Sequence, residues 1–298
     1  MNGVPQPTAP SGGSSAERWL ALDVGGTKLD VGVVDGDGAV LARRRAATGP
    51  EARAGGDALA DALVALCAAA LAEAPGATAV GVGCGGPMDG DLVSPLNIPA
   101  WRGFPLRSRL EVALSLPVSV DNDAKALALG EGWLGAATGV RDYLAMVVST
   151  GVGGGIVLDG RLLDGALGNA GHIGHVIVEP DGAECGCGAR GCLEAECSGL
   201  HLERRLGHPA ATAPPEVIER TGRLVGRAVA SVCNLLDLRL ALVAGSVALG
   251  FGDPFFAAAQ RELDACARLS FSTGAVVRPG GLGPDGPLLG AAAVARRR

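Results

Sequence analysis

The regular apolar pattern of the chain begins at Trp19, where short hydrophobic runs alternate with glycine-rich turns. The runs cover 19–24, 29–35 and 39–46, with Gly-Gly-Thr-Lys in the first turn and Asp-Gly-Asp-Gly in the second. Apolar and β-branched runs bounded by such turns are typical of antiparallel strands. The pattern therefore predicts that a β-meander opens an α/β domain.

Helical spacing appears further along the chain. Leu, Val and Ala recur on one face over 55–74, which predicts a helix, and a β-run at 78–84 follows it. A short strand at 118–121 runs into another helix, and a strand at 143–149 leads into a second glycine-rich turn and a partner strand. The remaining predicted elements are helices at 200–207, 215–237, 254–268 and 286–296 and strands at 240–249 and 274–277.

Composition narrows the possible classes of function. The 298 residues suffice for two cores, and because 48% are hydrophobic but only 3% aromatic, Ala, Val and Leu must fill them. A net charge of −6 gives no reason to expect nucleic-acid binding, and no apolar run approaches the ~20 residues that span a bilayer. Residues 1–16, rich in Pro, Gly and Ser, predict a disordered tail. We expect a cytoplasmic protein without nucleic-acid or membrane partners.

The stretch from 171 to 194 concentrates metal-binding side chains. Its spacing is H-x9-C-x-C-x4-C, with glycines between the thiols, and the four residues are His175, Cys185, Cys187 and Cys192. Three thiolates and one imidazole complete a tetrahedral zinc site with no open position for water. We interpret the stretch as a structural zinc knuckle. The alternatives are buried free cysteines beside a core histidine and, more weakly, a disulfide, since no secretory signal is seen.

The same stretch resembles the signature of the ROK family, a group of bacterial sugar kinases and related sugar-responsive repressors. The shared pattern is Gly-His-x-x-Val followed by Cys-x-Cys-Gly-x2-Gly-Cys-x-Glu, and further motifs extend the resemblance from Trp19 to the last helix. It implies that His175 both ligates zinc and faces a sugar, and that Glu194 accepts hydrogen bonds from sugar hydroxyls. The repressors carry a DNA-binding domain ahead of this fold, for which the short tail leaves no room.

Two glycine loops resemble the phosphate loops of the sugar kinase and actin-like superfamily. In the first, glycines let backbone N–H groups approach phosphate oxygens, and Asp23 would lie near Mg²⁺, although the loop taken alone is more typical of an ordinary hairpin turn. The second follows the strand at 143–149, and the Gly-Ser pair within the run at 240–249 resembles the adenosine loop. The resemblance implies nucleotide contacts at Asp23, Gly25, Gly26, Thr27, Lys28, Thr150, Gly151, Gly245 and Ser246.

The resemblance also implies a general base at Asp123, at the tip of the strand at 118–121. This carboxylate would take the proton from the primary hydroxyl of the sugar as that oxygen attacks the γ-phosphorus. Asn122 would orient the sugar, although either residue is a good helix N-cap. Gly86 and Asn97 are further expected sugar contacts, whereas Trp101 is interpreted as a structural anchor.

One substitution bears on the identity of the sugar. ROK glucokinases mostly read Gly-Glu-x-Gly-His where this chain reads Gly-His-Ile-Gly-His, with His172 in the place of the glutamate. This variant and the Gly-Ser pair resemble bacterial N-acetylmannosamine kinases. An imidazole N–H can meet an amide carbonyl at C2, and a carboxylate cannot. The hypothesis is that His172 favours an N-acylated hexose, and the alternative is neutral drift within a glucokinase.

The resemblance implies an α/β, actin-like/ribonuclease H-like fold of two domains with an interdomain cleft and a zinc knuckle. The expected domains are 17–121 plus 284–298 and the larger 122–283, which carries the zinc. The expected activity is ATP-dependent phosphorylation of the 6-hydroxyl of a hexose or an N-acetylhexosamine, with ATP, Mg²⁺ and structural Zn²⁺ and a homodimeric or homotetrameric assembly. A catalytically inactive sugar sensor is the alternative.

Overall fold

The computed structural model describes residues 17–49 and 55–297, so the tail expected to be disordered lies outside the described residues. The described chain divides into two compact units, one running to Arg141 and resuming at Leu282, the other covering Asp142–Gly281. The first unit therefore extends 20 residues beyond the boundary expected after residue 121. The reason is that α4 (Asp123–Trp133) packs against α9 (Gly286–Arg296) and β4 (Ala79–Cys84) of the first unit.

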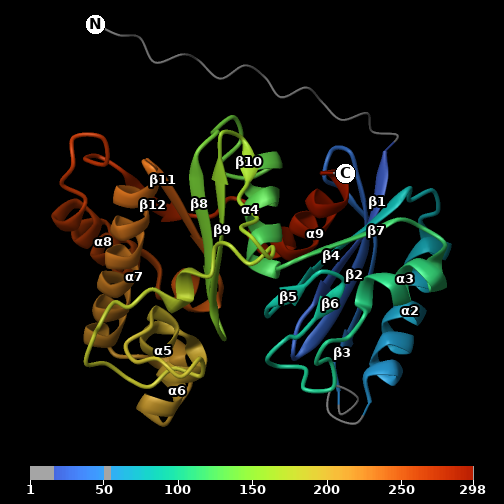
Figure 1. The fold of residues 1–298 in the computed structure, drawn as a ribbon, viewed down its shortest axis with the longest axis horizontal. Coiled ribbons are helices and arrows are strands. Elements are labelled where there is room, and N and C mark those ends of the chain that lie inside the picture. The colour runs from blue at the N-terminus through green and yellow to red at the C-terminus, as the bar shows by residue number, and fades with distance from the viewer. Residues whose placement is uncertain (1–16, 50–54, 298) are drawn as a thin grey trace, which may run out of the picture. The chain divides into compact units, whose positions relative to one another are not determined.

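The first unit is built on a sheet with the order β3-β2-β1-β4-β7. The predicted meander forms β1 (Arg18–Val24), β2 (Lys28–Asp35) and β3 (Val40–Ala47), and β4 and β7 (Val118–Asp121) run parallel to β1 (Figure 1). In register, Asp23 of β1 lies beside Gly83 of β4, and Gly83 beside Asp121 of β7. The carboxyl ends of these parallel strands share one edge of the sheet, where α/β proteins bind ligands.

Alternate residues of β1 fill two different cores. Leu20 and Leu22 pack in a cluster with side chains of α2 (Gly56–Glu73) and α3 (Leu106–Leu114), whereas Trp19 and Ala21 pack with α9. Such alternation follows from the two-residue period of a strand. The contact with α9 is very close, because a Cβ atom on Gly81 of β4 would stand 1.9 Å from the backbone oxygen of Ala291.

The second unit contains a sheet with the order β10-β9-β8-β11-β12. Strands β8 (Tyr143–Val148) and β9 (Val152–Leu158) are antiparallel, whereas β11 (Leu240–Ala244) runs parallel to β8 and β12 (Val276–Pro279) parallel to β11; β10 is Arg161–Leu162. The helices of this unit are α5 (Leu193–Cys197), α6 (Gly199–Leu206), α7 (Pro215–Leu236) and α8 (Ser246–Cys266) (Figure 1). None of the helices in the described ranges is long and apolar enough to cross a membrane.

The strand predicted over 240–249 ends earlier than the sequence indicated. β11 stops at Ala244, Gly245 takes a left-handed φ of 100°, and α8 begins at Ser246. A second left-handed glycine, Gly252, interrupts α8, so only the part after it corresponds to the helix expected at 254–268. The short hairpin of β5 (Met88–Asp89) and β6 (Leu92–Val93) was also not expected.

Candidate active site and metal centre

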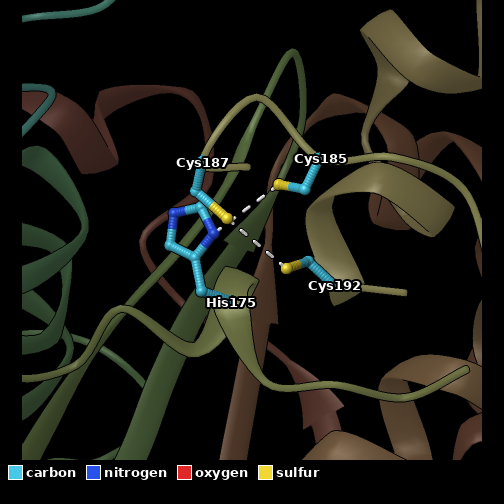
Figure 2. Close-up of side chains that lie close together, drawn as sticks. All are labelled: His175, Cys185, Cys187 and Cys192. Carbon is cyan, nitrogen blue, oxygen red and sulfur yellow. Dashed lines mark hydrogen bonds between the residues drawn. The ribbon is translucent and has the colours of Figure 1, made fainter. Parts of the chain in front are cut away.

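Four side chains of the second unit converge on one point (Figure 2). The ligand atoms of His175, Cys185, Cys187 and Cys192 all lie within 4.8 Å of one another. Cys185 Sγ stands 3.7 Å from His175 Nδ1, and Cys187 Sγ stands 3.7 Å from Cys192 Sγ. Zn–S bonds of ~2.3 Å in a tetrahedron place neighbouring ligand atoms about 3.8 Å apart. The donor set and its spacing therefore fit zinc, and the sulfur separation is far too long for a disulfide.

Glycine conformations allow the chain to turn this tightly. Gly188 and Gly191 have φ values of 92° and 71°, and a Cβ on Gly191 would stand 1.6 Å from the backbone oxygen of Glu179. The turn closes through the Cys185 N–H, which donates to the backbone oxygen of Ala189 at 2.8 Å. The positive φ values at both positions favour glycine, and these turns bring the three thiols together.

A buried carboxylate holds the other end of the metal loop. Glu196 is only 3% exposed, accepts the Ala183 N–H at 2.7 Å and pairs with Arg220 at 2.8 Å. Burial acts to raise the pKa of Glu196, but this N–H and the guanidinium outweigh burial and lower that pKa. The loop is thus fixed to α5 and α7 independently of the metal.

The metal loop also lies against the second glycine loop. Gly174 precedes His175, and a Cβ on it would stand 2.2 Å from the backbone oxygen of Val152 in β9. Glu194, two residues after the last cysteine, accepts the Val152 N–H at 3.1 Å. The His172 and His175 rings stand 6.0 Å apart between centroids and are tilted by only 23°. The expected sugar residues of this unit are therefore held by the same loop that gathers the thiols.

The first glycine loop is a tight turn in the first unit. The Gly25 N–H donates to the backbone oxygen of Lys28 at 3.0 Å, and a Cβ on Gly26 would stand 2.3 Å from the Cβ of Asn97. Two residues that the sequence separates by about 70 positions are therefore in contact. The Lys28 ammonium lies 3.9 Å from Asp23 and 3.6 Å from the buried Asp30.

Two carboxylates meet at the shared edge of the first sheet. Asp23 is the penultimate residue of β1, and the exposed Asp123 begins α4 after β7. Burial and the charge of Asp123 raise the pKa of Asp23 to about 6, and Lys28 opposes them. A Cβ on Gly85 would stand 3.4 Å from Asp123 Oδ2, so the small residue keeps this carboxylate accessible.

The neighbouring loop residues have separate roles. Asn122 is the N-cap of α4, since its Oδ1 accepts the Ala124 N–H at 3.0 Å, and its amide donates to the backbone oxygen of Gly86 at 3.4 Å. Trp101 is fully buried, and its indole N–H donates to the backbone oxygen of Gly56 at 2.9 Å. It is an anchor for the loop that carries Asn97, as the sequence indicated.

A cavity of about 200 Å³ lies within the second unit. Its lining includes hydroxyl residues from the β8–β9 turn (Ser149, Thr150) and from the start of α8 (Ser246). The Ser149 and Ser246 hydroxyls are 2.9 Å apart, and a Cβ on Gly245 would stand 2.4 Å from the backbone oxygen of Val148. The remaining walls come from α6, the 3₁₀ turn Ala210–Thr212 and the first turns of α8. The sequence analysis named Thr150 and Ser246 and missed the other residues that line the cavity.

Comparisons with known proteins agree with this arrangement. The ROK family model matches residues 19–298. A glucokinase of Halalkalibacterium halodurans is 36% identical over 247 residues, 71% of this chain and 74% of that protein. An N-acetylmannosamine kinase of Escherichia fergusonii is 36% identical over 251 residues, 78% of this chain and 84% of that protein.

Solved structures extend the comparison to the fold. A ROK hexokinase from Thermus thermophilus has a TM-score of 0.80 at 36% identity and covers 94% of this chain and 98% of its own. A ROK family glucokinase from Streptomyces griseus, in complex with glucose and AMPPNP, has a TM-score of 0.79 at 30% identity. The match covers 94% of this chain and 100% of that protein. A ROK family transcriptional regulator, at 23% identity, covers 94% of this chain and 78% of its own and shares the fold alone, with a TM-score of 0.80.

Proposed function

Because this chain belongs to the ROK family, we propose that it is an ATP-dependent kinase that phosphorylates the 6-hydroxyl of a hexose or an N-acylated hexosamine. Curated relatives at 36% identity are named glucokinase and N-acetylmannosamine kinase, which supports a sugar kinase. The observation that carries the proposal is the pair of carboxylates, Asp23 and Asp123, at the carboxyl edge of the first sheet. The experiment is an ADP-release assay with purified protein and a panel of sugars.

Asp123 is the proposed general base. Its carboxylate is exposed at the start of α4 and can receive the proton of the 6-hydroxyl while that oxygen bonds to the γ-phosphorus and the bond to ADP breaks. Asn122, Gly86 and Asn97 would orient the sugar. Asp23, with Lys28 beside it, would hold the Mg²⁺ that accompanies ATP, and that ion screens the phosphate charge.

The second unit would supply the remaining sugar and nucleotide contacts. Glu194 and His172 would bind sugar hydroxyls or an acyl group, and His175 would both face the sugar and complete the zinc site. Four protein ligands leave no open position on zinc, so its role would be structural. We assign no chemical step to it.

The nucleotide would lie over the two glycine loops and the cavity. Gly25, Gly26 and Thr27 would meet phosphates from one loop, and Thr150 and Gly151 from the other, with Gly245 and Ser246 beside the nucleoside. At about 200 Å³ the cavity is smaller than the ~300–1,000 Å³ of sites that enclose a drug-sized ligand. It therefore suits a nucleoside better than a whole nucleoside triphosphate.

A sugar sensor without catalysis is the second candidate, favoured by the regulator that shares the fold. The two candidates differ in one measurement. A sensor binds sugar but releases no ADP, whereas the kinase releases ADP in proportion to the sugar 6-phosphate formed.

The identity of the sugar is predicted from His172. We expect a kcat/KM for N-acetylmannosamine above that for glucose, because an imidazole N–H can donate to the acyl carbonyl. His172→Glu should shift the ratio toward glucose by about 10-fold or more, the scale of one altered polar contact. The measurement is ADP release with glucose, mannose, N-acetylglucosamine and N-acetylmannosamine, with a sugar-free reaction as control. A hundredfold preference of the wild type for glucose would contradict the assignment.

Asp23→Asn should stabilise the free protein at neutral pH. The pKa of Asp23 is raised from 3.8 to about 6, so its ionised form destabilises the folded state above pH ~6. The difference of about 2.2 pKa units corresponds to about 3 kcal/mol in the free energy of unfolding at pH 8, and the gain should shrink steadily below pH 6. The same variant should use ATP poorly.

Tryptophan fluorescence can measure the stability of the unit that contains Asp23. Trp19, Trp101 and Trp133 all lie in the first unit, so their fluorescence during urea unfolding reports the unit that contains Asp23. Asp37→Asn, in an exposed turn of the same unit, is the matched control and should leave the free energy of unfolding unchanged. Equal stability of wild type and Asp23→Asn at pH 8, without magnesium or nucleotide, would be the contrary result.

A further inference from the structure

Glu203 is the only charged side chain among the described residues that line the cavity of the second unit. It lies on the same face of α6 as Gly199 and Leu200, which also line the cavity, as the helical period requires. Glu203 is exposed, and its carboxylate has no hydrogen-bond or ion-pair partner within the described chain, so it is available to a ligand at the cavity. Neither the fold of α6 nor the metal loop requires an acidic residue here.

Hydrogen bonds place this carboxylate relative to the second glycine loop. The Gly199 N–H donates to the backbone oxygen of Ser149 at 2.7 Å, and the Leu200 N–H donates to that of Thr150 at 3.4 Å. α6 therefore begins against the loop, and Glu203 follows one helical turn, about 6 Å, further along. The other walls of the cavity include apolar side chains such as Pro209 and Phe251.

The lining of the cavity thus combines three kinds of group. Two hydroxyls, of Ser149 and Thr150, belong to the loop, the Glu203 carboxylate follows about one helical turn from it, and most other lining side chains are apolar. A carboxylate accepts hydrogen bonds and donates none, so it repels phosphate and needs donor groups. A ribose offers two neighbouring hydroxyls to its two oxygens, and a flat base suits apolar walls.

We propose that Glu203 binds the 2′- and 3′-hydroxyls of the ribose and thereby makes the donor site specific for ribonucleotides. The proposal rests on the proposed kinase function, because it takes the phosphates to lie on the Ser149–Thr150 loop. A guanine base could also offer two donors to a carboxylate, but Glu203 follows only one helical turn, about 6 Å, after the residues that bond the loop, which is closer to the phosphates than a base would lie. Selectivity for the sugar of the nucleotide, and not for its base, is therefore the expected role.

The test compares the kcat/KM values for ATP and for 2′-deoxyATP. The wild type should use ATP with a kcat/KM about 10- to 100-fold above that for 2′-deoxyATP, the scale of a hydrogen bond to a charged group. Glu203→Ala should bring that ratio to within ~3-fold of unity by raising the KM for ATP, with kcat and the KM for the sugar nearly unchanged. Glu203→Gln should be intermediate, since an amide keeps one acceptor.

A matched control is Glu216→Gln, an exposed glutamate in the first turn of α7 that removes the same charge outside the cavity. It should keep the wild-type ratio. A purely structural role for Glu203 would lower stability or raise both KM values while leaving the ratio intact, and that result would overturn the proposal. Two results for the wild type would also overturn the proposal. One is an equal kcat/KM for ATP and 2′-deoxyATP, and the other is a higher kcat/KM for GTP than for ATP.

Failure of the proposed function can be told apart from failure of this inference. If no sugar supports turnover, the kinase assignment fails, and calorimetric binding of ADP and 2′-deoxyADP to wild type and Glu203→Ala still tests the ribose contact. Equal affinities of the wild type for the two nucleotides would then overturn it. If turnover occurs and Glu203→Ala keeps the full discrimination, the kinase stands and the ribose contact is wrong.

Discussion

Asp123→Asn is expected to lower kcat by about 10²- to 10⁴-fold, the usual contribution of a general base, while sugar binding survives. The amide has the shape of the carboxylate but cannot accept the proton of the attacking hydroxyl. Asn122 caps α4, so the helix should still begin at the same residue in the variant. The measurement is steady-state ADP release together with calorimetric titration of the sugar.

The controls for this prediction come from the same unit. Asp37→Asn makes the same chemical change in an exposed turn and should retain full turnover. If the kcat of Asp123→Asn is within a few-fold of the wild-type value, Asp123 is not the general base. The neighbouring Asp23, whose pKa of about 6 would suit proton transfer near neutral pH, would then be the carboxylate to test.

Cys187→Ser is expected to abolish stoichiometric zinc and to destabilise the second unit by several kcal/mol. A metal site that forms only in the folded chain contributes its binding free energy to folding, and structural zinc sites reach ~10–16 kcal/mol in small domains. Here Glu196 and the surrounding core hold part of the loop without metal, so the expected loss is smaller. Elemental analysis gives the metal content, and circular dichroism follows the unfolding.

Cys266→Ser is the matched control, because this exposed thiol lies outside the cluster. It should retain zinc and stability. Since all three tryptophans belong to the first unit, a loss seen by circular dichroism but weakly by fluorescence would locate the damage in the second. Full zinc occupancy in Cys187→Ser would mean that the four side chains do not form the site.

The sequence predicted most strands because local signals define them. The meander, the glycine turns and the strand ends follow from residues close together in the chain, and the resemblance to the ROK family is confirmed by the match over 19–298. The run Leu-Ala-Leu-Val-Ala-Gly-Ser-Val-Ala-Leu shows the limit of such signals. It is apolar on both sides of Gly245-Ser246, so hydrophobicity does not separate β11 from α8, and only this pair marks the break.

Other features depend on contacts between distant residues. The first unit extends past residue 121 because Gly290 of α9 comes so close to α4 that a Cβ on it would stand 2.7 Å from the backbone oxygen of Ala126. The cavity is likewise assembled from α6, a 3₁₀ turn and α8, and Glu203 has no motif around it. Helical spacing alone would have put Gly199, Leu200 and Glu203 on one face without saying what that face meets.

The close approach of Gly81 to Ala291 has a consequence for biosynthesis. A ribosome makes β4 roughly 200 residues before the helix that covers one side of it, so that side of the early sheet stays uncovered while the whole intervening unit emerges. The segment Asp142–Gly281, whose sheet and helices are continuous in sequence, can fold first. A chain that ends at Gly281 and is released from the ribosome should therefore show protease resistance in the later-made segment and sensitivity in the earlier one.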